Sequence, residues 1–430
     1  MTSPLHRLDR LTAMIRRKRD ERIALRFADA ARQPEAAAYR QLLPHSLAFA
    51  SLRPSSSVVP AVNLVLPELS FGAIFAGIRT ALEVAAGLSA RGGVPLRVVV
   101  LRGAPPGADR DRLVTWIRQE LPATAGAAID IVAAEWAIDA IVHPSDVWIA
   151  THWTTAHPLE VACRMGTVPP DQVLYLVQDY EPGFTAWSSE YALAEATYHA
   201  GFDLVVNSVP VQRRLADADG IVVPDDRVFR PQLDLDRLEA ARRERAALAA
   251  KRNGDGEARV LFYARPTKPR NLFRIGIAAL EIAAGRAAQS GISLRITSAG
   301  ETHPVPSGGR LSGMTVLGKL PWDAYFSELA RTDVLLSLQM SPHPSHPPLD
   351  AVLSGGRTVT NDLSGSRSGL HPRLAAVAPE PTALADALLS SLRASDDETG
   401  ASAPTALLPA LGSELGPVLD AAAARHGLSA

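Results

Sequence analysis

A proline-rich turn near the end of the chain gathers side chains that could bind a polar ligand. It lies in the stretch LSLQMSPHPSHPPLDAVLSGGRTVTND, residues 336–362, between an apolar strand and a helix. Ser345 is placed to cap the helix that Pro347 and Pro348 begin, because proline is tolerated in the first turn of a helix. The turn is either stiffened for packing or holds a ligand with the side chains of Ser341, His343, Ser345, His346 and Asp350.

Asp350 and the histidine pair each have two interpretations. Asp350 lies in the first turn of the predicted helix, where a carboxylate either complements the helix dipole or accepts hydrogen bonds from sugar or ribose hydroxyls. His343 and His346 have a spacing that could suit a metal, but no third ligand of an obvious type accompanies them. Hydrogen bonding to a polar ligand is therefore the favoured role of these histidines, and no metal is expected.

A second candidate loop, FYARPTKPRN at residues 262–271, concentrates positive charge between a predicted strand and a predicted helix. Cations are unfavourable at the amino end of a helix unless an anion lies among them. A diphosphate fits, because guanidinium groups bind phosphate oxygens through paired hydrogen bonds. Solvated surface charge is the alternative for the residues assigned here to anion binding: Arg265, Lys268, Arg270, Asn271 and, after a later strand, Lys319.

The first half of the chain carries polar and aromatic side chains where predicted strands end. Gly72 lies in a strand-to-helix turn that lacks the glycine spacing of a dinucleotide fingerprint, so we expect a small-residue loop open to an acceptor. His152 follows one predicted strand, and Asp179, Tyr180 and Glu181 follow another. Carboxylates bind hydroxyl groups and aromatic faces stack on the C–H surface of sugars, so these loops favour sugar recognition over a merely polar turn.

Strands that alternate with helices predict crossover units and parallel sheets on both sides of an aperiodic, Pro- and Asp-rich segment at residues 222–236. The expected fold class is therefore α/β, with two doubly wound halves. Ligands of such sheets bind in the loops at the carboxyl ends of the strands, where all the candidate loops lie. The predicted domains are an N-terminal helical extension, two Rossmann-like domains and C-terminal helices that pack back on the first domain, at residues 1–55, 56–228, 229–380 and 381–430.

The composition is that of an ordinary globular protein. Hydrophobic residues make up 47% of the 430 residues and charged residues 21%, enough apolar content for large buried cores. The net charge of −1 excludes a global electrostatic footprint for nucleic acid. One cysteine, Cys163, excludes an internal disulfide and a cysteine-based zinc site, which favours a cytoplasmic protein.

Membrane contact is left open by the N-terminal residues. The most apolar stretch, residues 69–78, is far shorter than the ~20 residues of a spanning helix. Residues 5–19 combine apolar positions at helical spacing with a basic run, but show no apolar core of the signal-peptide type. They predict either a helix packed on the first domain or a basic helix in peripheral contact with the inner face of a membrane.

Three motifs together resemble a known family. LVQDYEP, FYARPTKPRN and SPHPSHPPLDAVLSGGRTVTN are similar to segments of GT-B glycosyltransferases of family 4, and more closely of bacterial rhamnosyltransferases of the WsaF type. The resemblance covers residues 62–362. It implies two Rossmann-like domains that face a central cleft, the first for the acceptor and the second for a nucleotide-sugar donor.

The resemblance also implies roles for individual residues. Arg265 and Lys319 would hold the donor diphosphate, with Arg265 acting in catalysis. Asp350 would bind the ribose in place of the second glutamate of the family's Glu-x7-Glu motif. Pro342 occupies the position of the first glutamate, so His343 or the backbone of its loop would contact the donor sugar instead. Asp179 would orient the acceptor hydroxyl, as the second catalytic residue.

The implied activity is a retaining, metal-independent hexosyl transfer in surface polysaccharide synthesis. The expected donor is dTDP-L-rhamnose, with a UDP- or GDP-sugar as the alternative, and the expected acceptor is a glycan or a lipid-linked glycan. No cofactor is expected. The alternative functions are a nucleotide-sugar epimerase and a non-catalytic protein of the same fold that binds sugar nucleotides.

Overall fold

The computed structural model describes residues 36–71, 76–251, 257–394 and 404–428. Gly72 and the basic N-terminal segment, both named in the sequence-based predictions, lie outside these residues. The chain divides into two compact units. The first consists of residues up to 207 together with 215–229 and 413–430, and the second of residues 208–214 and 230–412.

The sheet of the first unit is parallel throughout and has the order β4-β3-β2-β6-β7-β8-β9. Its strands β2 and β7 are buried on both faces, as the apolar run VLYLV of β7 predicts. Strands β3 and β4 are added on one side of β2, whereas β6 to β9 are added on its other side. The order of strands therefore reverses between β2 and β6, and α/β sheets bind ligands at such points. The strands are β2 (Val62–Leu66), β3 (Leu96–Val100), β4 (Ile129–Ala133), β6 (Val147–Ala150), β7 (Val173–Val177), β8 (Asp203–Asn207) and β9 (Val228–Phe229).

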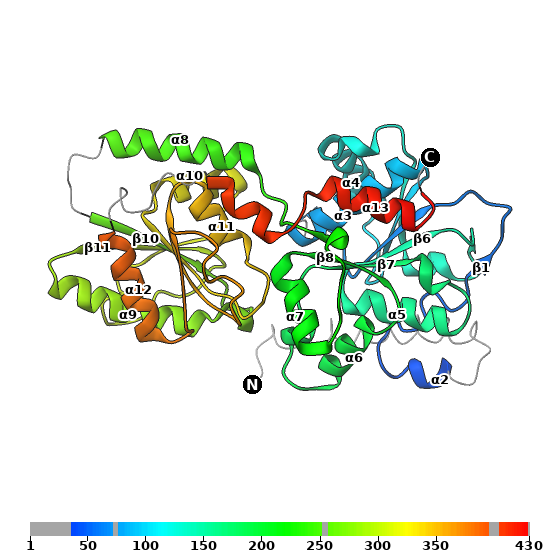
Figure 1. Ribbon diagram of the computed structural model, residues 1–430, viewed down its shortest axis with the longest axis horizontal. Helices are drawn as coiled ribbons and strands as arrows, with labels where there is room; N and C mark the ends of the chain where they lie inside the picture. Colours follow the sequence, from blue (N-terminus) through cyan, green and yellow to red (C-terminus); the bar gives the residue numbers. More distant parts are fainter. Residues whose placement is uncertain (1–35, 72–75, 252–256, 395–403, 429–430) are drawn as a thin grey trace, which may run out of the picture. The chain divides into compact units, whose positions relative to one another are not determined.

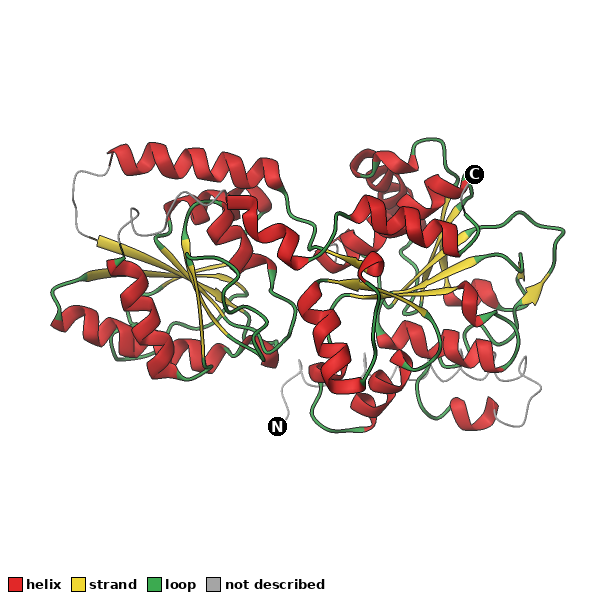
Figure 2. Ribbon diagram, viewed as in Figure 1, coloured by secondary structure: helices red, strands yellow, loops and turns green. Residues whose placement is uncertain are grey.

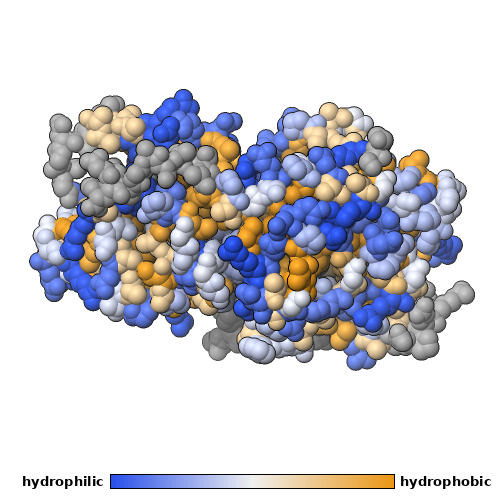
Figure 3. Space-filling view, in the orientation of Figure 1, coloured by the Kyte–Doolittle hydropathy of each residue, from blue (hydrophilic) through white to orange (hydrophobic). Residues whose placement is uncertain are grey.

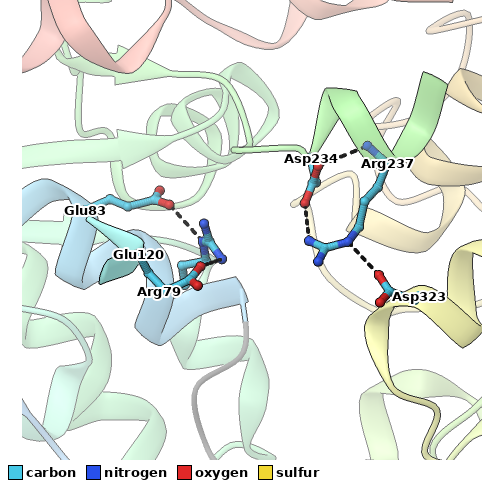
Figure 4. A network of polar contacts seen from close by, with 6 residues as sticks. All are labelled: Arg79, Glu83, Glu120, Asp234, Arg237 and Asp323. Carbon is cyan, nitrogen blue, oxygen red and sulfur yellow. Dashed lines mark hydrogen bonds and ion pairs between the residues drawn. The ribbon is translucent and has the colours of Figure 1, made fainter. Parts of the chain in front are cut away.

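Helices cover both faces of this sheet (Figure 1). On one face lie α3 (Ala76–Gly92), α4 (Gly107–Glu120) and α13 (Leu415–Arg425), and on the other lie α5 (Trp153–Arg164), α6 (Ser189–Tyr198) and α7 (Val209–Asp219). A short α2 (Ala36–Tyr39) and a two-stranded ribbon of β1 (Arg53–Pro54) and β5 (Ile141–Val142) complete the unit. In Figure 4, Arg79 near the start of α3 bonds Glu83 at 3.0 Å and Glu120 of α4 at 3.5 Å.

The last helix of the chain belongs to the first unit. Val418, Leu419 and Ala422 of α13 are buried in the core formed with α3. Asp203, at the start of β8, bonds Arg425 at 3.0 Å and His426 at 3.1 Å. Burial would raise the pKa of Asp203, but the hydrogen bond from His426 and the neighbouring arginines outweigh burial and lower it. A carboxylate therefore anchors this helix.

The sheet of the second unit is also parallel and has the order β12-β11-β10-β13-β14-β15. The central position of β10 places the loops that follow β11 and β13 on its two sides. The strands are β10 (Glu257–Ala264), β11 (Ser293–Gly300), β12 (Thr315–Gly318), β13 (Val334–Ser337), β14 (Arg357–Asn361) and β15 (Leu374–Val377).

Two separate apolar cores lie on the two faces of the second sheet, each under its own helices (Figure 2). One core is covered by α8 (Leu235–Lys251), α10 (Trp322–Arg331), α11 (His346–Leu353) and the 3-10 helix η9 (Pro404–Leu411), and the other by α9 (Phe273–Gln289) and α12 (Pro381–Arg393). Arg237 of α8 bonds Asp234 and, at 3.0 Å, Asp323 of α10 (Figure 4). The segment 381–430, predicted to return as a whole to the first domain, is divided: α12 packs on α9 and only α13 lies in the first unit.

The surface shows no broad apolar belt in the view of Figure 3, where hydrophilic and hydrophobic atoms are mixed over both units. Within the described residues, none of the helices combines the length and the apolarity that a bilayer-spanning segment requires.

Candidate functional site

The second unit assembles its candidate residues where its parallel strands end. Arg265 follows β10, Glu301 follows β11, Lys319 follows β12 and the proline-rich turn follows β13. Gly300 has a φ of +125°, and a Cβ there would overlap the carbonyl oxygen of Ala264. This glycine therefore lets the loops after β10 and β11 approach closely.

Arg265 is held by an acidic residue that the sequence reasoning missed. Its Nε lies 3.5 Å from Oε1 of Glu301, and 34% of the Arg265 side chain is exposed. Glu301 also accepts hydrogen bonds from the backbone N–H of Thr267 at 3.0 Å and from its hydroxyl at 2.8 Å. Burial would raise the pKa of Glu301, but the bonds from Thr267 and the charge of Arg265 lower it overall. Glu301 therefore orders the basic loop and leaves part of the guanidinium open to a ligand.

The other residues assigned to anion binding divide into two groups. Lys268 and Lys319 are exposed, as a phosphate contact requires, and Arg270 is half-buried. Asn271 is buried, and its side-chain amide donates to the carbonyl oxygen of Leu338 at 3.1 Å. Asn271 thus ties the basic loop to the proline-rich turn. The ligand contact expected of it stays a prediction.

One buried arginine organises the proline-rich turn. Arg367, fully buried after β14, donates to the backbone carbonyl oxygens of Ser341 at 2.9 Å and His343 at 2.8 Å. It also donates to those of Asn361 at 3.1 Å and Pro344 at 3.4 Å. A guanidinium group presents its donors in a rigid fork, so these bonds fix the course of the turn. The stiffness of the turn therefore comes from a non-local contact as well as from its prolines.

The polar side chains of the turn are mostly bonded within it. The Ser341 hydroxyl accepts from the N–H of His343 at 3.1 Å, and the Ser345 hydroxyl donates to the side chain of Gln339 at 3.1 Å. Ser345 does not cap α11 through its side chain, contrary to the sequence-based prediction. Its φ of +69° is a conformation that L residues with a Cβ rarely adopt.

The two histidines of the turn are neutral. Burial lowers the pKa of His343 well below its ordinary value, and the neighbouring His346 ring and the positive charges of Arg367 and Arg270 lower it further. Burial lowers the pKa of His346 to about 4. Nδ1 of His343 accepts from the N–H of Ser345 at 3.0 Å, so the neutral ring carries its proton on Nε2. His343 can therefore serve as an uncharged donor. Among the described residues no three His, Cys, Asp or Glu side chains gather as a metal site would need.

Asp350 is a buried acid at the edge of this site. It is 5% exposed, and Tyr325 of α10 donates to its Oδ2 at 3.1 Å. Burial raises the pKa of Asp350 to about 7, against the opposing effect of the Tyr325 bond and with a further contribution from Asp234. Tyr263, whose pKa burial also raises, lies within the electrostatic reach of both Asp350 and Arg265. An acid whose pKa lies near neutrality can accept a hydrogen bond from a ligand hydroxyl when ionised and donate one to it when protonated.

The raised pKa of Asp350 predicts that the contribution of this group to stability falls as pH rises. The unfolded chain ionises this group near pH 3.8, whereas the folded protein ionises it near pH 7. Between these values the folded state binds more protons at Asp350, so its contribution to the free energy of unfolding falls by roughly 3 kcal/mol from pH 5 to pH 8. His343 and His346, whose pKa values are lowered, contribute the opposite slope below about pH 6.5. The difference in free energy of unfolding between wild type and Asp350→Asn, measured by urea unfolding at each pH, isolates Asp350 and should fall by that amount. A difference that does not change with pH would contradict the assignment.

In the first unit, Glu181 has a structural position. Its carboxylate is buried and accepts from the backbone N–H of Trp153, the first residue of α5, and from the Tyr175 hydroxyl at 2.9 Å. A carboxylate at the amino end of a helix satisfies a donor that the helix leaves open. The backbone N–H of Glu181 donates to the Tyr198 hydroxyl at 2.9 Å. Glu181 therefore couples the loop after β7 to α5, a contact that differs from the predicted acceptor contact.

Asp179, Tyr180 and His152 lie at the same edge of the first sheet. Asp179 is 7% exposed, and its carboxylate accepts from the N–H of Tyr180 at 2.8 Å. The Tyr180 hydroxyl donates to Asp219 at 3.2 Å. His152 caps α5 by accepting from the N–H of Thr154, and its ring stacks on Phe184 with centroids 6.3 Å apart. The sequence-predicted residues of the first unit, apart from Gly72, thus occupy two adjacent strand-to-helix loops.

Comparison with known proteins decides the family. The N-terminal domain of WsaF matches residues 61–208, and the C-terminal domain of WsaF matches residues 258–389. The chain belongs to the WsaF family. The N-terminal WsaF match contains His152, Asp179 and the rest of the first-unit loops. The C-terminal match contains Arg265, Lys319, Asp350 and the turn that Arg367 holds.

One relative of this WsaF-family chain is the O-antigen biosynthesis protein RfbC of Myxococcus xanthus, 30% identical over 321 residues. The aligned region is 74% of this chain but only 23% of RfbC, so the chain spans about a quarter of that relative.

Solved structures share the fold of the chain at low sequence identity. HepE of Anabaena, in complex with UDP and glucose, has a TM-score of 0.57 at 13% identity, over 85% of this chain and 99% of that one. The UDP-forming α,α-trehalose-phosphate synthase of Burkholderia xenovorans has a TM-score of 0.56 at 10% identity, over 86% and 99%. The chain therefore has the GT-B fold of two Rossmann-like domains, as predicted.

Proposed function

We propose that this WsaF-family protein is a glycosyltransferase of surface polysaccharide biosynthesis. It takes a sugar from a nucleoside diphosphate donor, bound at the carboxyl edge of the second sheet, and passes it to a glycan or lipid-linked glycan. The observation that carries the proposal is the position of Arg265, partly exposed and oriented by Glu301, at the same sheet edge as the buried acid Asp350. The names of the relatives agree: RfbC acts in O-antigen biosynthesis and HepE was solved with UDP-glucose.

Each side chain has a definite task in this proposal. Arg265, together with Lys268 of the same loop and Lys319 after β12, neutralises the diphosphate as the bond between the anomeric carbon and the phosphate oxygen breaks. Fixed charges aimed at a leaving group lower the barrier because they need no reorganisation during the reaction. Asp350 receives the ribose hydroxyls, and the neutral N–H of His343 takes the donor-sugar contact left by Pro342. Asp179 orients the acceptor hydroxyl, whose oxygen bonds to the anomeric carbon while its proton passes to the leaving diphosphate.

The finer assignment follows the WsaF resemblance. The donor is dTDP-L-rhamnose, transfer retains the configuration at the anomeric carbon, and no metal takes part. The protein works in the cytoplasm, where nucleotide sugars are found. Its first unit carries Asp179, Tyr180 and His152 on the acceptor side.

A panel of nucleotides and nucleotide sugars tests the donor assignment. Thermal shift should rise with dTDP and dTDP-L-rhamnose more than with UDP- or GDP-sugars. Transfer of rhamnose to an acceptor glycan should then be detected by mass spectrometry. Asp179→Asn should keep the dTDP shift and lose transfer by roughly a hundredfold or more, because the lost group acts only in the chemical step. Binding of dTDP-L-rhamnose without transfer to any acceptor, but with a change in the sugar itself, would instead identify an epimerase.

A further inference from the structure

Trp187 is the most exposed large apolar side chain among the described residues. Its side chain is 89% exposed, and its ring lies parallel to that of Tyr191, with centroids 5.0 Å apart and an angle of 7° between the planes. An exposed indole leaves apolar area in water and contributes little to the fold. The stacking nevertheless orders the ring, so the pair presents a preformed flat aromatic surface.

The position of this pair connects it to the candidate acceptor residues. Trp187 follows the short helix after β7, and Tyr191 lies in the first turn of α6, which the Ser188 hydroxyl caps. The Tyr191 hydroxyl lies 3.5 Å from that of Tyr180, which bonds Asp219. The Trp187–Tyr191 ring pair and the Asp179–Tyr180 loop are therefore parts of one hydrogen-bonded segment.

The charges of the residues around Trp187 and Tyr191 restrict what this ring pair can bind. No lysine or arginine occurs between Arg164 and Arg213. Glu190, next to Tyr191, is exposed and Glu195 of the same helix is half-buried, whereas Asp179 and Glu181 are buried and bonded within the protein. The carboxylates of Glu190 and Glu195, with no nearby cation in the sequence, disfavour the phosphates of nucleic acid and of anionic lipids. A neutral ligand rich in hydroxyl and C–H groups fits, because the negative face of an aromatic ring attracts polarised C–H bonds.

We propose that Trp187 and Tyr191 form a platform on which a sugar ring of a neutral glycan stacks. This inference rests on the proposed function, for which the glycan is the acceptor. The indole supplies the stacking face, and the ring of Tyr191 holds it in place. The platform sets which glycans are accepted and leaves the donor site unaffected.

Affinity electrophoresis in gels that contain a soluble rhamnan, mannan or dextran tests the platform. At least one polysaccharide should retard the wild-type protein. Trp187→Ala should weaken that binding about tenfold or more, as the loss of an aromatic anchor does. Trp187→Tyr should restore much of it by keeping an aromatic face. The matched control is Trp322→Ala, which removes another exposed indole, 45% exposed and stacked on Phe326 in the second unit.

Equal retardation of the wild type and the Trp187→Ala variant would overturn the proposal, as would a wild type that none of the gels retards. Binding through Trp187 to phosphatidylcholine–phosphatidylglycerol vesicles in place of the polysaccharides would also overturn it. An unliganded melting temperature equal to that of the wild type shows that Trp187→Ala is folded, and its thermal shift with dTDP should match the wild type as well. Loss of every nucleotide response with polysaccharide binding intact would contradict the proposed function alone.

Discussion

Replacing Arg265 by alanine should weaken the binding of nucleoside diphosphates roughly a hundredfold, because a charge-assisted, paired hydrogen bond to phosphate is lost in a partly desolvated site. The structure sharpens this expectation. Glu301, itself held by two bonds from Thr267, orients the guanidinium before a ligand arrives, so little side-chain freedom is lost on binding. Arg265→Lys should recover only part of the affinity, because an ammonium group cannot bind two phosphate oxygens in the same fork.

The measurement is isothermal titration with dTDP and UDP. Arg295→Ala is the matched control: Arg295 pairs with Glu257 at 2.9 Å on the same two strands, β10 and β11, but toward their amino ends. That variant should bind nucleotides like the wild type. If both variants bind equally well, the carboxyl edge of the second sheet is not the diphosphate site.

Replacing Arg367 by methionine should destabilise the second unit by about 3 kcal/mol or more, because buried carbonyl groups lose their donor. The carbonyl oxygens concerned belong to Ser341, His343, Pro344 and Asn361. Methionine keeps the apolar stem of the side chain, so the loss reports on hydrogen bonds more than on packing. Nucleotide binding should weaken as well, since the turn that carries His343 is no longer held.

Urea unfolding followed by a probe in the second unit measures this effect. Arg331→Met is the control, because Arg331 is half exposed and pairs with Glu244 at 3.5 Å, an interaction worth less than about 1 kcal/mol. Arg367→Lys should rescue little, since one ammonium group cannot serve all four carbonyls. A methionine variant as stable as the control would show that the turn is held by its prolines alone.

Residues of the candidate site were predicted from sequence where a local signal existed. Lys268 and Lys319 lie exposed at strand ends, and Arg265 and Asp350 lie at the same sheet edge, because strand endings can be read from local apolar runs. Glu301 directly follows the strand that ends at Gly300, so the same signal was available for it. Arg367 lies in a loop of serines and glycines that gives no indication of a buried guanidinium.

The amino-acid sequence by itself determined the alternation of strands and helices, and with it two parallel sheets whose carboxyl edges carry the polar loops. These are local properties, since apolar runs and turn residues act over a few neighbouring positions. Only the tertiary structure decided which loops meet: Glu301 on Arg265, Arg367 on the turn after β13, and Glu181 on the amino end of α5. Those contacts follow from the order of the strands in each sheet, which depends on long-range packing that local patterns do not specify.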